Sequence, residues 1–160
     1  MRKLLLALCL FTTLFAEEMT VQSESAHYDG DRIILIGDVI IESGFGTVMA
    51  EKAILLRDGE EIEGTFRPTK ITLEGNVRMI RAEAAQYALA DWAEYYPNEK
   101  RLLLTSKSKV LFFDKEKEIQ MVAPAILALD NGQSIEGIGN VRFVFKSDEL
   151  EKIKNQFKGA

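Results

Sequence analysis

A short phrase recurs along this chain and restricts the folds that the chain can adopt. The pattern Gly, Asp or Asn, then Val occurs at Gly37–Val39, Gly75–Val77 and Gly139–Val141, each time after an apolar segment. A degenerate fourth copy, Ser108-Lys109-Val110, lies between the second and the third. The four Val residues are therefore spaced 38, 33 and 31 residues apart. Periods of this length are typical of stacked supersecondary units that bury their apolar faces only against neighbours.

A second, Ala-rich element precedes each copy of the phrase. It reads SAHY from Ser25, AEKAIL from Ala50, ADWAEY from Ala90 and APAILA from Ala123. Turn signals separate the elements at Asp29-Gly30, Asp58-Gly59, Pro97-Asn98 and Asn131-Gly132. Asp-Gly and Asn-Gly favour tight hairpin turns because they tolerate positive φ. Short runs of Ile, Val, Leu, Phe and Thr between such turns predict an all-β roll, sandwich or barrel of repeated hairpin-like units.

Alternation around each phrase predicts which side chains face inward. In a strand, Val and the residue two positions later share one face, while the intervening polar residues share the other. The predicted inner wall consists of Val39, Ile41, Val77, Met79, Val110, Phe112, Val141 and Phe143. A Gly inside such a strand indicates a bulge, a bend or a close backbone approach.

Three segments fit the repeat less well. The Ala-rich stretch from Arg81 to Tyr96 favours a helix by propensity, but it lacks a clean helical stripe and lies between two strand signals. We predict a strand there, with a helix as the alternative. Pro124 cannot donate a hydrogen bond to a ladder, so its strand should lie at an edge or bulge at this point. The charged tail, residues 147–160, predicts a short helix or a frayed end.

The N-terminus has the layout of a secretory signal peptide, residues 1–16. Basic Arg2 and Lys3 precede an apolar run, Leu4–Phe15, and a plausible cleavage site follows Ala16. The run is shorter than the roughly 20 residues that a bilayer span requires, which disfavours an uncleaved anchor. Lipidation at Cys9 is disfavoured because Leu8 precedes it and the apolar run continues beyond it. The sequence thus predicts an exported, cysteine-free domain over residues 17–146.

Charge and side-chain chemistry argue against nucleic-acid binding and catalysis. Without Arg2 and Lys3, 18 basic residues remain against 25 acidic ones, a net charge of about −7, with no basic stripe. The single His, His27, has no partner at zinc spacing, and Asp29-Gly30-Asp31 does not continue as a calcium loop. No nucleophile–base pair stands in a recognisable context. We therefore expect a protein that is not an enzyme and that needs no metal or cofactor.

The ordered phrases LIGDVII, AEKAIL, LEGNVRM, ADWAEYY and GIGNVRF, behind a signal peptide, resemble the OstA-like family of periplasmic lipopolysaccharide-transport proteins. The resemblance covers about Ser25 to Phe145, and departs from the pattern at Ser108-Lys109 and at Pro124. It implies an open, V-shaped antiparallel β-jelly-roll that holds the acyl chains of lipopolysaccharide between its sheets. It also implies head-to-tail stacking of copies, and inner- and outer-membrane transport partners of similar fold.

The resemblance makes the inner wall a candidate lipid-binding surface, whereas the residues alone favour a filled core. Basic side chains that could meet lipid phosphates are Arg78, Arg81, Lys107, Lys109 and Arg142. We expect a periplasmic lipopolysaccharide-binding transport protein that bridges the two membranes by end-to-end assembly. The alternatives are a structural or scaffolding β-repeat protein of the envelope without lipid cargo, and a membrane-anchored partner subunit that keeps Leu4–Phe15.

Overall fold

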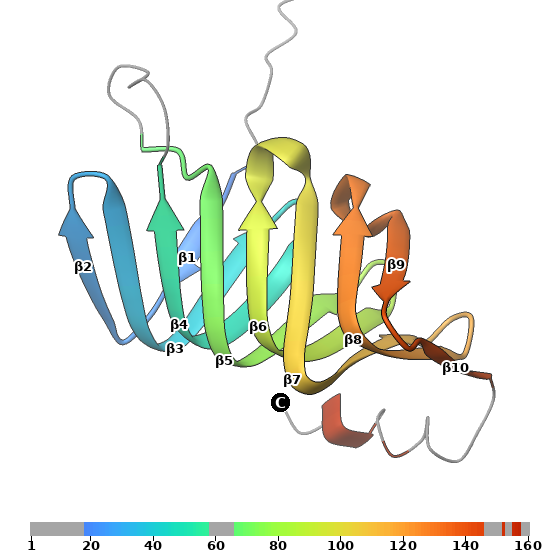
Figure 1. The fold of residues 1–160 in the computed structure, drawn as a ribbon. Coiled ribbons are helices and arrows are strands. Elements are labelled where there is room, and N and C mark those ends of the chain that lie inside the picture. Colours follow the sequence, from blue (N-terminus) through green and yellow to red (C-terminus); the bar gives the residue numbers. More distant parts are fainter. Residues whose placement is uncertain (1–17, 58–65, 146–151, 153–154, 158–160) are drawn as a thin grey trace, which may run out of the picture.

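The computed structural model describes residues 18–57, 66–145, 152 and 155–157. Within these residues ten strands form one antiparallel sheet whose first and last strands do not meet (Figure 1). This confirms the predicted open, all-β architecture. No helix in the described part of the chain has the length and apolar character that crossing a membrane would require. The predicted signal peptide and the Asp58-Gly59 turn lie outside the described residues.

The strands follow the repeated units closely. They are β1 (Thr20–Gln22), β2 (Ser25–Asp29), β3 (Arg32–Ser43), β4 (Gly46–Leu56), β5 (Lys70–Arg81), β6 (Gln86–Tyr96), β7 (Arg101–Asp114), β8 (Ile119–Leu129), β9 (Ser134–Ile138) and β10 (Arg142–Phe145). Two short 3₁₀ turns, η1 (Pro97–Glu99) and η2 (Asp130–Gly132), connect β6 to β7 and β8 to β9. The Gly-[Asp/Asn]-Val phrases lie in β3, in β5 and at the junction of β9 and β10.

The sheet bends along one line, which we call the crease, where the five ladders that join β3 through β8 each lose register. In β3 the pair Gly37-Asp38 forms a bulge, with φ of 84° and 44°, opposite Glu51 of β4. In β5 the pair Gly75-Asn76 repeats it, with φ of 82° and 47°. Positive φ is cheap for Gly and tolerated by Asn and Asp, which explains the residue types of the phrase. The predicted bulge is therefore confirmed.

The crease divides the sheet into two halves that pack face to face. The front half consists of β2, β9 and the parts of the long strands that pair in line between them. These parts are residues 32–36, 52–56, 70–74, 92–96, 101–105 and 125–129. The rear half holds β1, β10 and segments 39–43, 46–50, 77–81, 86–90, 110–114 and 119–123. In Figure 1 the front half stands upright, and the same strands turn at its foot into the rear half.

Pro124 and the degenerate repeat meet at the crease. β8 pairs with β7 on one side and with β9 and β10 on the other, so Pro124 does not lie in an edge strand; of the two predicted alternatives, an edge or a bulge, the structure has the bulge. The break in register that the proline requires is present, because the β7–β8 ladder skips residues 106–109 opposite it. The longer insertion in β7 thus replaces the missing Gly-Asn bulge.

The segment from Arg81 to Tyr96 is the end of β5, a turn and strand β6, so the helix alternative is wrong. Tertiary packing overrides helix propensity here because the alanines of β6 fill a row between larger side chains. Ala93 lies directly between Leu73 and Leu104 in neighbouring strands, and all three are buried. In β4, on the other side of β5, Ala53 lies between Leu35 and Leu73 in the same way.

The Ala-x-x-Ala spacing follows from the bend. Ala50 and Ala53 flank the crease of β4, and Ala90 and Ala93 flank that of β6; all four are buried in the core. Residues three apart would face opposite sides of a regular strand, so their shared inward direction requires the crease. Small side chains suit the vertex, where the two halves are closest.

The described part of the tail reaches the outer face of the rear half. Lys152 and residues 155–157 are helical. Phe157 packs against Tyr87, with ring centroids 4.8 Å apart, and beside the buried Phe113. The outer face therefore carries a small apolar cluster of its own.

Candidate functional site

The space between the two halves is the candidate site, and the predicted inner wall lines it. Six of the eight predicted residues belong to one buried cluster: Val39, Ile41, Val77, Met79, Val110 and Phe112. Each is at most 5% exposed, because side chains of the front half pack against them. In this structure the middle of the space is therefore filled by the protein's own side chains.

The other two predicted wall residues lie at the C-terminal end of the sheet and are exposed. Val141 and Phe143 are 37% and 48% exposed, and Phe145 is 67% exposed. Phe143 pairs with the buried Met121, which places it on the inner face, and its ring stacks on Phe145 with centroids 6.0 Å apart. This end of the inner face is an apolar surface open to solvent.

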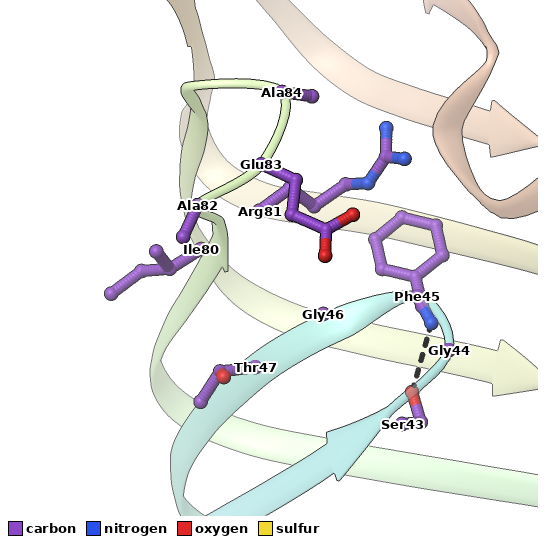
Figure 2. Close-up of a pocket in the computed structure, with 10 residues that line it drawn as sticks. All are labelled: Ser43, Gly44, Phe45, Gly46, Thr47, Ile80, Arg81, Ala82, Glu83 and Ala84. Atoms are coloured by element: carbon purple, nitrogen blue, oxygen red, sulfur yellow. Dashed lines mark hydrogen bonds between the residues drawn. The ribbon is translucent and has the colours of Figure 1, made fainter.

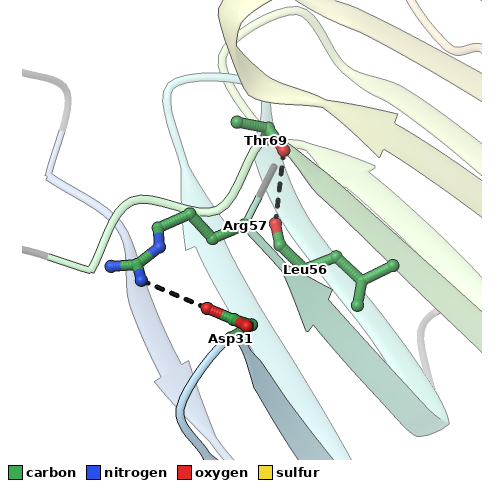
Figure 3. Close-up of polar contacts among 4 residues, drawn as sticks. All are labelled: Asp31, Leu56, Arg57 and Thr69. Atoms are coloured by element: carbon green, nitrogen blue, oxygen red, sulfur yellow. Dashed lines mark hydrogen bonds and ion pairs between the residues drawn. The ribbon is translucent and has the colours of Figure 1, made fainter. Parts of the chain in front are cut away.

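The N-terminal end exposes a second aromatic group. Tyr28 pairs with Ile33, whose side chain packs on the core, so Tyr28 is on the inner face; it is 64% exposed. Its ring meets Phe66 edge-on at 6.1 Å. The Arg57 guanidinium lies over Phe66. Arg57 also donates to Asp31 at 3.3 Å, and the Thr69 hydroxyl donates to the Leu56 carbonyl (Figure 3). These contacts fix the strand ends around the exposed tyrosine.

Both outer edges of the sheet have unpaired sides. β1 and β2 pair with β3 alone, and β9 and β10 pair with β8 alone, among the residues that the structure describes. All five residues of β2 are exposed. An edge of this kind presents backbone N–H and C=O groups to another strand.

Opposite the crease, the turns of the two halves meet at what we call the mouth. Phe45, in the β3–β4 turn of the rear half, is 1% exposed and packs edge-on against Tyr95 of the front half at 5.9 Å. Arg81 lies over the Phe45 ring, 5.6 Å from its centroid, and donates to the carbonyl of Gly132 in η2 at 3.0 Å. Residues 43–47 and 80–84 enclose a pocket of about 340 Å³ beside these contacts (Figure 2).

The sequence did not reveal the mouth residues Phe45 and Tyr95, or Phe66 at the N-terminal end. A Gly-Phe-Gly turn is compatible with an exposed aromatic as much as with a buried one. Phe45 is buried only because the two halves of the sheet meet at the mouth. Of the mouth residues, Gly132 alone had a sequence signal: the Asn-Gly motif identified it as a turn residue, although not as a contact of Arg81.

The five candidate phosphate-binding residues are not brought together. Arg81 lies at the mouth, whereas Lys107 and Lys109 lie in the crease insertion of β7. Arg78 and Arg142 are on the outer face of the rear half, since their neighbours Met79 and Phe143 face inward. No single cationic site is formed by these side chains.

Acidic residues support the crease from the neighbouring strands. Asp91 of β6 accepts the Ser106 hydroxyl at 2.6 Å and the Lys107 backbone N–H at 3.0 Å. These hydrogen bonds, that of Ser106 above all, lower the pKa of Asp91. Glu51 holds an equivalent place over Gly75, where an added Cβ would collide with its carboxylate. Glu24 stands in the same way over Gly37.

Metal-binding geometry is not found in the described ranges. No group of three or more His, Cys, Asp or Glu side chains there is arranged to hold an ion. Asp29 and Asp31 instead pair with Arg32 and Arg57, as expected of a turn. His27 is exposed on β2.

The comparisons with known proteins find similarity to solved structures. A scan against protein-family models finds no match, and neither does a search of curated proteins. The crystal structure of LptH from Pseudomonas aeruginosa, the LptA homologous periplasmic component of the conserved lipopolysaccharide transport device, matches with a TM-score of 0.64 and 14% sequence identity. The match covers 82% of this chain and 96% of that chain. It establishes a shared fold, the open β-jelly-roll.

Proposed function

We propose that this chain is a periplasmic component of lipopolysaccharide transport that shelters acyl chains against the inner face of its sheet. The observation that carries the proposal is the apolar inner face, which reaches solvent at both ends. It ends in Tyr28 on one side and in Phe143 and Phe145 on the other. The fold shared with LptH, itself a lipopolysaccharide transport component, supports the same function.

Such a surface moves lipid without covalent chemistry. Removing an acyl chain from water gains about 0.8 kcal/mol per buried CH₂ group. Transfer along the face then needs only similar affinity at successive positions. The predicted signal peptide, residues 1–16, would deliver the domain to the periplasm; mass spectrometry of the exported chain should find Glu17 as its first residue.

A specific observation favours the scaffold alternative. The interior residues Val39, Val77 and Val110 are at most 1% exposed, so the middle of the space is packed like an ordinary core. A scaffold keeps that packing whether or not lipid is present. A carrier must instead exchange some of these side-chain contacts for acyl-chain contacts.

We further propose that copies join through their free edges, with β9 and β10 of one copy beside β1 and β2 of the next. β1 and β2 run antiparallel to β9 and β10 when the sheet is continued, as the internal order of strands requires. The sheet would then extend across the joint with its crease aligned, by the strand-addition mode of recognition.

The internal ladders predict the register of this joint. Val77 lies opposite Ala90, and the Gly75-Asn76 bulge lies opposite Asp91. By the same rule Val141 should lie opposite Ser23 of the next copy, and the Gly139-Asn140 bulge opposite Glu24.

Continuing that register places apolar residues together on the inner face. Phe143 would meet Val21 of the next copy, and Ile135 would meet Tyr28. Each exposed aromatic group would then lie beside an apolar residue of the other copy, and the inner face would run continuously between copies. On the outer face, Glu136 would lie opposite His27.

The joint is tested by disulfide formation between two singly substituted chains, both also carrying Cys9→Ser. A mixture of Glu136→Cys and His27→Cys should give a linked dimer under mild oxidation. The matched control pairs Glu136→Cys with Ala26→Cys, which lies on the inner face because it pairs with the buried Leu35. Absence of a linked dimer from the first mixture, or equal linkage in both mixtures, would contradict the joint.

Lipid binding is tested with the purified protein and a fluorescent long-chain fatty acid that lipopolysaccharide displaces. Phe143→Asp should weaken binding at least tenfold, because it puts a charge on the inner face. Arg142→Asp, one residue away on the outer face, is the matched control and should bind as the unsubstituted protein does. No displaceable binding in the unsubstituted protein would favour the scaffold.

A further inference from the structure

The two halves of the sheet are held together differently at the crease and at the mouth. At the crease, the long strands run from one half into the other through the backbone. At the mouth, the contacts between halves described above are made by side chains of Phe45 and Arg81. A separation of the halves would therefore hinge at the crease and begin at the mouth.

Arg81 makes the polar contact between the two halves at the mouth. Its Nη1 donates both to the Gly132 carbonyl at 3.0 Å and to Gln86 Oε1 at 2.8 Å. Gln86 in turn donates to Asp114 Oδ2 at 3.2 Å, and Asp114 Oδ1 accepts the Lys117 backbone N–H at 3.0 Å. The hydrogen bonds thus tie the β5–β6 and β7–β8 turns of the rear half to η2 of the front half.

The backbone conformation of Gly132 and its lack of a side chain permit this contact. It is buried, has φ of 83°, and a Cβ added there would overlap the Arg81 guanidinium. A glycine at this position lets the guanidinium reach the backbone of the opposite half.

The hydrogen bonds of Arg81 can break without leaving an unpaired buried charge on an acceptor. Both acceptors of Arg81, a backbone carbonyl and an amide oxygen, are uncharged, so no buried ion pair has to be broken. The adjoining pocket, which Glu83 and Arg81 line together with small residues such as Gly46 and Ala84, leaves space beside the β5–β6 turn (Figure 2). A freed guanidinium would be rehydrated at the surface.

We propose that Arg81 and Gly132 form a gate. They hold the mouth closed in the lipid-free protein, and they separate when an acyl chain enters between the halves. The gate rests on the proposed function, because it regulates access to the same interior. It also accounts for an interior that is packed in this structure and yet has to accept a guest.

The test measures the association rate of a fluorescent long-chain fatty acid with the full chain by stopped flow. Arg81→Met keeps the length of the side chain and removes its donors; Gly132→Ala fills the place of the guanidinium. Both should raise the association rate about tenfold. Arg78→Met, on the outer face of the same strand, is the matched control and should leave the rate unchanged.

A second measurement does not depend on lipid. Amide hydrogen exchange of residues 44–47, 82–85 and 130–133 should become faster in both gate variants, while exchange at the crease stays unchanged. Binding at unaltered rates would overturn the gate and leave lipid carriage intact. Absence of binding in every variant would overturn both, and unchanged exchange at the mouth would overturn the gate alone.

Discussion

Single residues at the crease show why the repeated phrase has its composition. Gly75 has a positive φ, and the carboxylate of Glu51 occupies the place that a side chain would need. Asn76 follows, also with a positive φ, which completes the bulge. The same arrangement joins Glu24 to Gly37. The acidic residue of one strand and the glycine of the next therefore form one structural unit.

Gly75→Ala is predicted to lower the free energy of unfolding by roughly 2–3 kcal/mol, since it adds backbone strain to a collision with Glu51. Gly30→Ala is the matched control: its φ is +55°, but nothing lies within 4 Å of an added Cβ. It should cost only about 1 kcal/mol of backbone strain. Urea unfolding measures both. Equal losses would show that the carboxylate does not matter.

Asp91 should titrate below the ordinary range of an aspartate, because Ser106 and Lys107 donate to its carboxylate. The stabilisation this gives is complete above the pKa of the unfolded chain and is lost as the pH falls through the lower pKa of the folded state. Ser106→Ala should raise the pKa of Asp91, as followed by carboxyl-carbon NMR. An unchanged pKa of Asp91 in the Ser106→Ala variant would show that the Ser106 hydroxyl does not cause the shift.

At the scale of elements, alternation predicts the inward faces within each half of the sheet but not across the bend. Val39 and Ile41 obey period two, as do Val77 and Met79. Ala50 and Ala53 violate it, because the crease turns both inward. A bend of this kind depends on matching bulges in neighbouring strands, which a single strand's pattern does not reveal. The same holds at Pro124, because the loss of register there depends on the insertion in the neighbouring strand β7 as well as on the proline.

The row of alternating large and small side chains at the crease should not tolerate added volume. Ala93→Leu is predicted to lower the free energy of unfolding by about 1–3 kcal/mol, because Leu73 and Leu104 flank it. Ala125→Leu, in a half-exposed position of β8, is the matched control and should change stability by less than about 0.5 kcal/mol. Thermal or urea unfolding distinguishes them; equal effects would remove the packing argument.

At the scale of the molecule, the sequence predicts the class of fold but not how it closes. Repeats, turn motifs and alternation are local, and they indicated an all-β repeat with an apolar inner wall. Whether Phe45 is buried at the mouth, or Phe143 exposed at an end, depends on contacts between residues distant in sequence. The inner-wall set accordingly divides into six core residues and two exposed end residues, Val141 and Phe143.

Photo-crosslinking in living cells tests most directly the proposal that the inner face of the sheet carries acyl chains. A photoreactive amino acid is placed singly at Phe143 and Met79 on the inner face, and at Val144 and Ile80 on the outer face of the same strands. If acyl chains lie on the inner face, lipopolysaccharide adducts should form from the two inner positions only. Adducts from neither inner position, or equal capture from inner and outer positions, would contradict it.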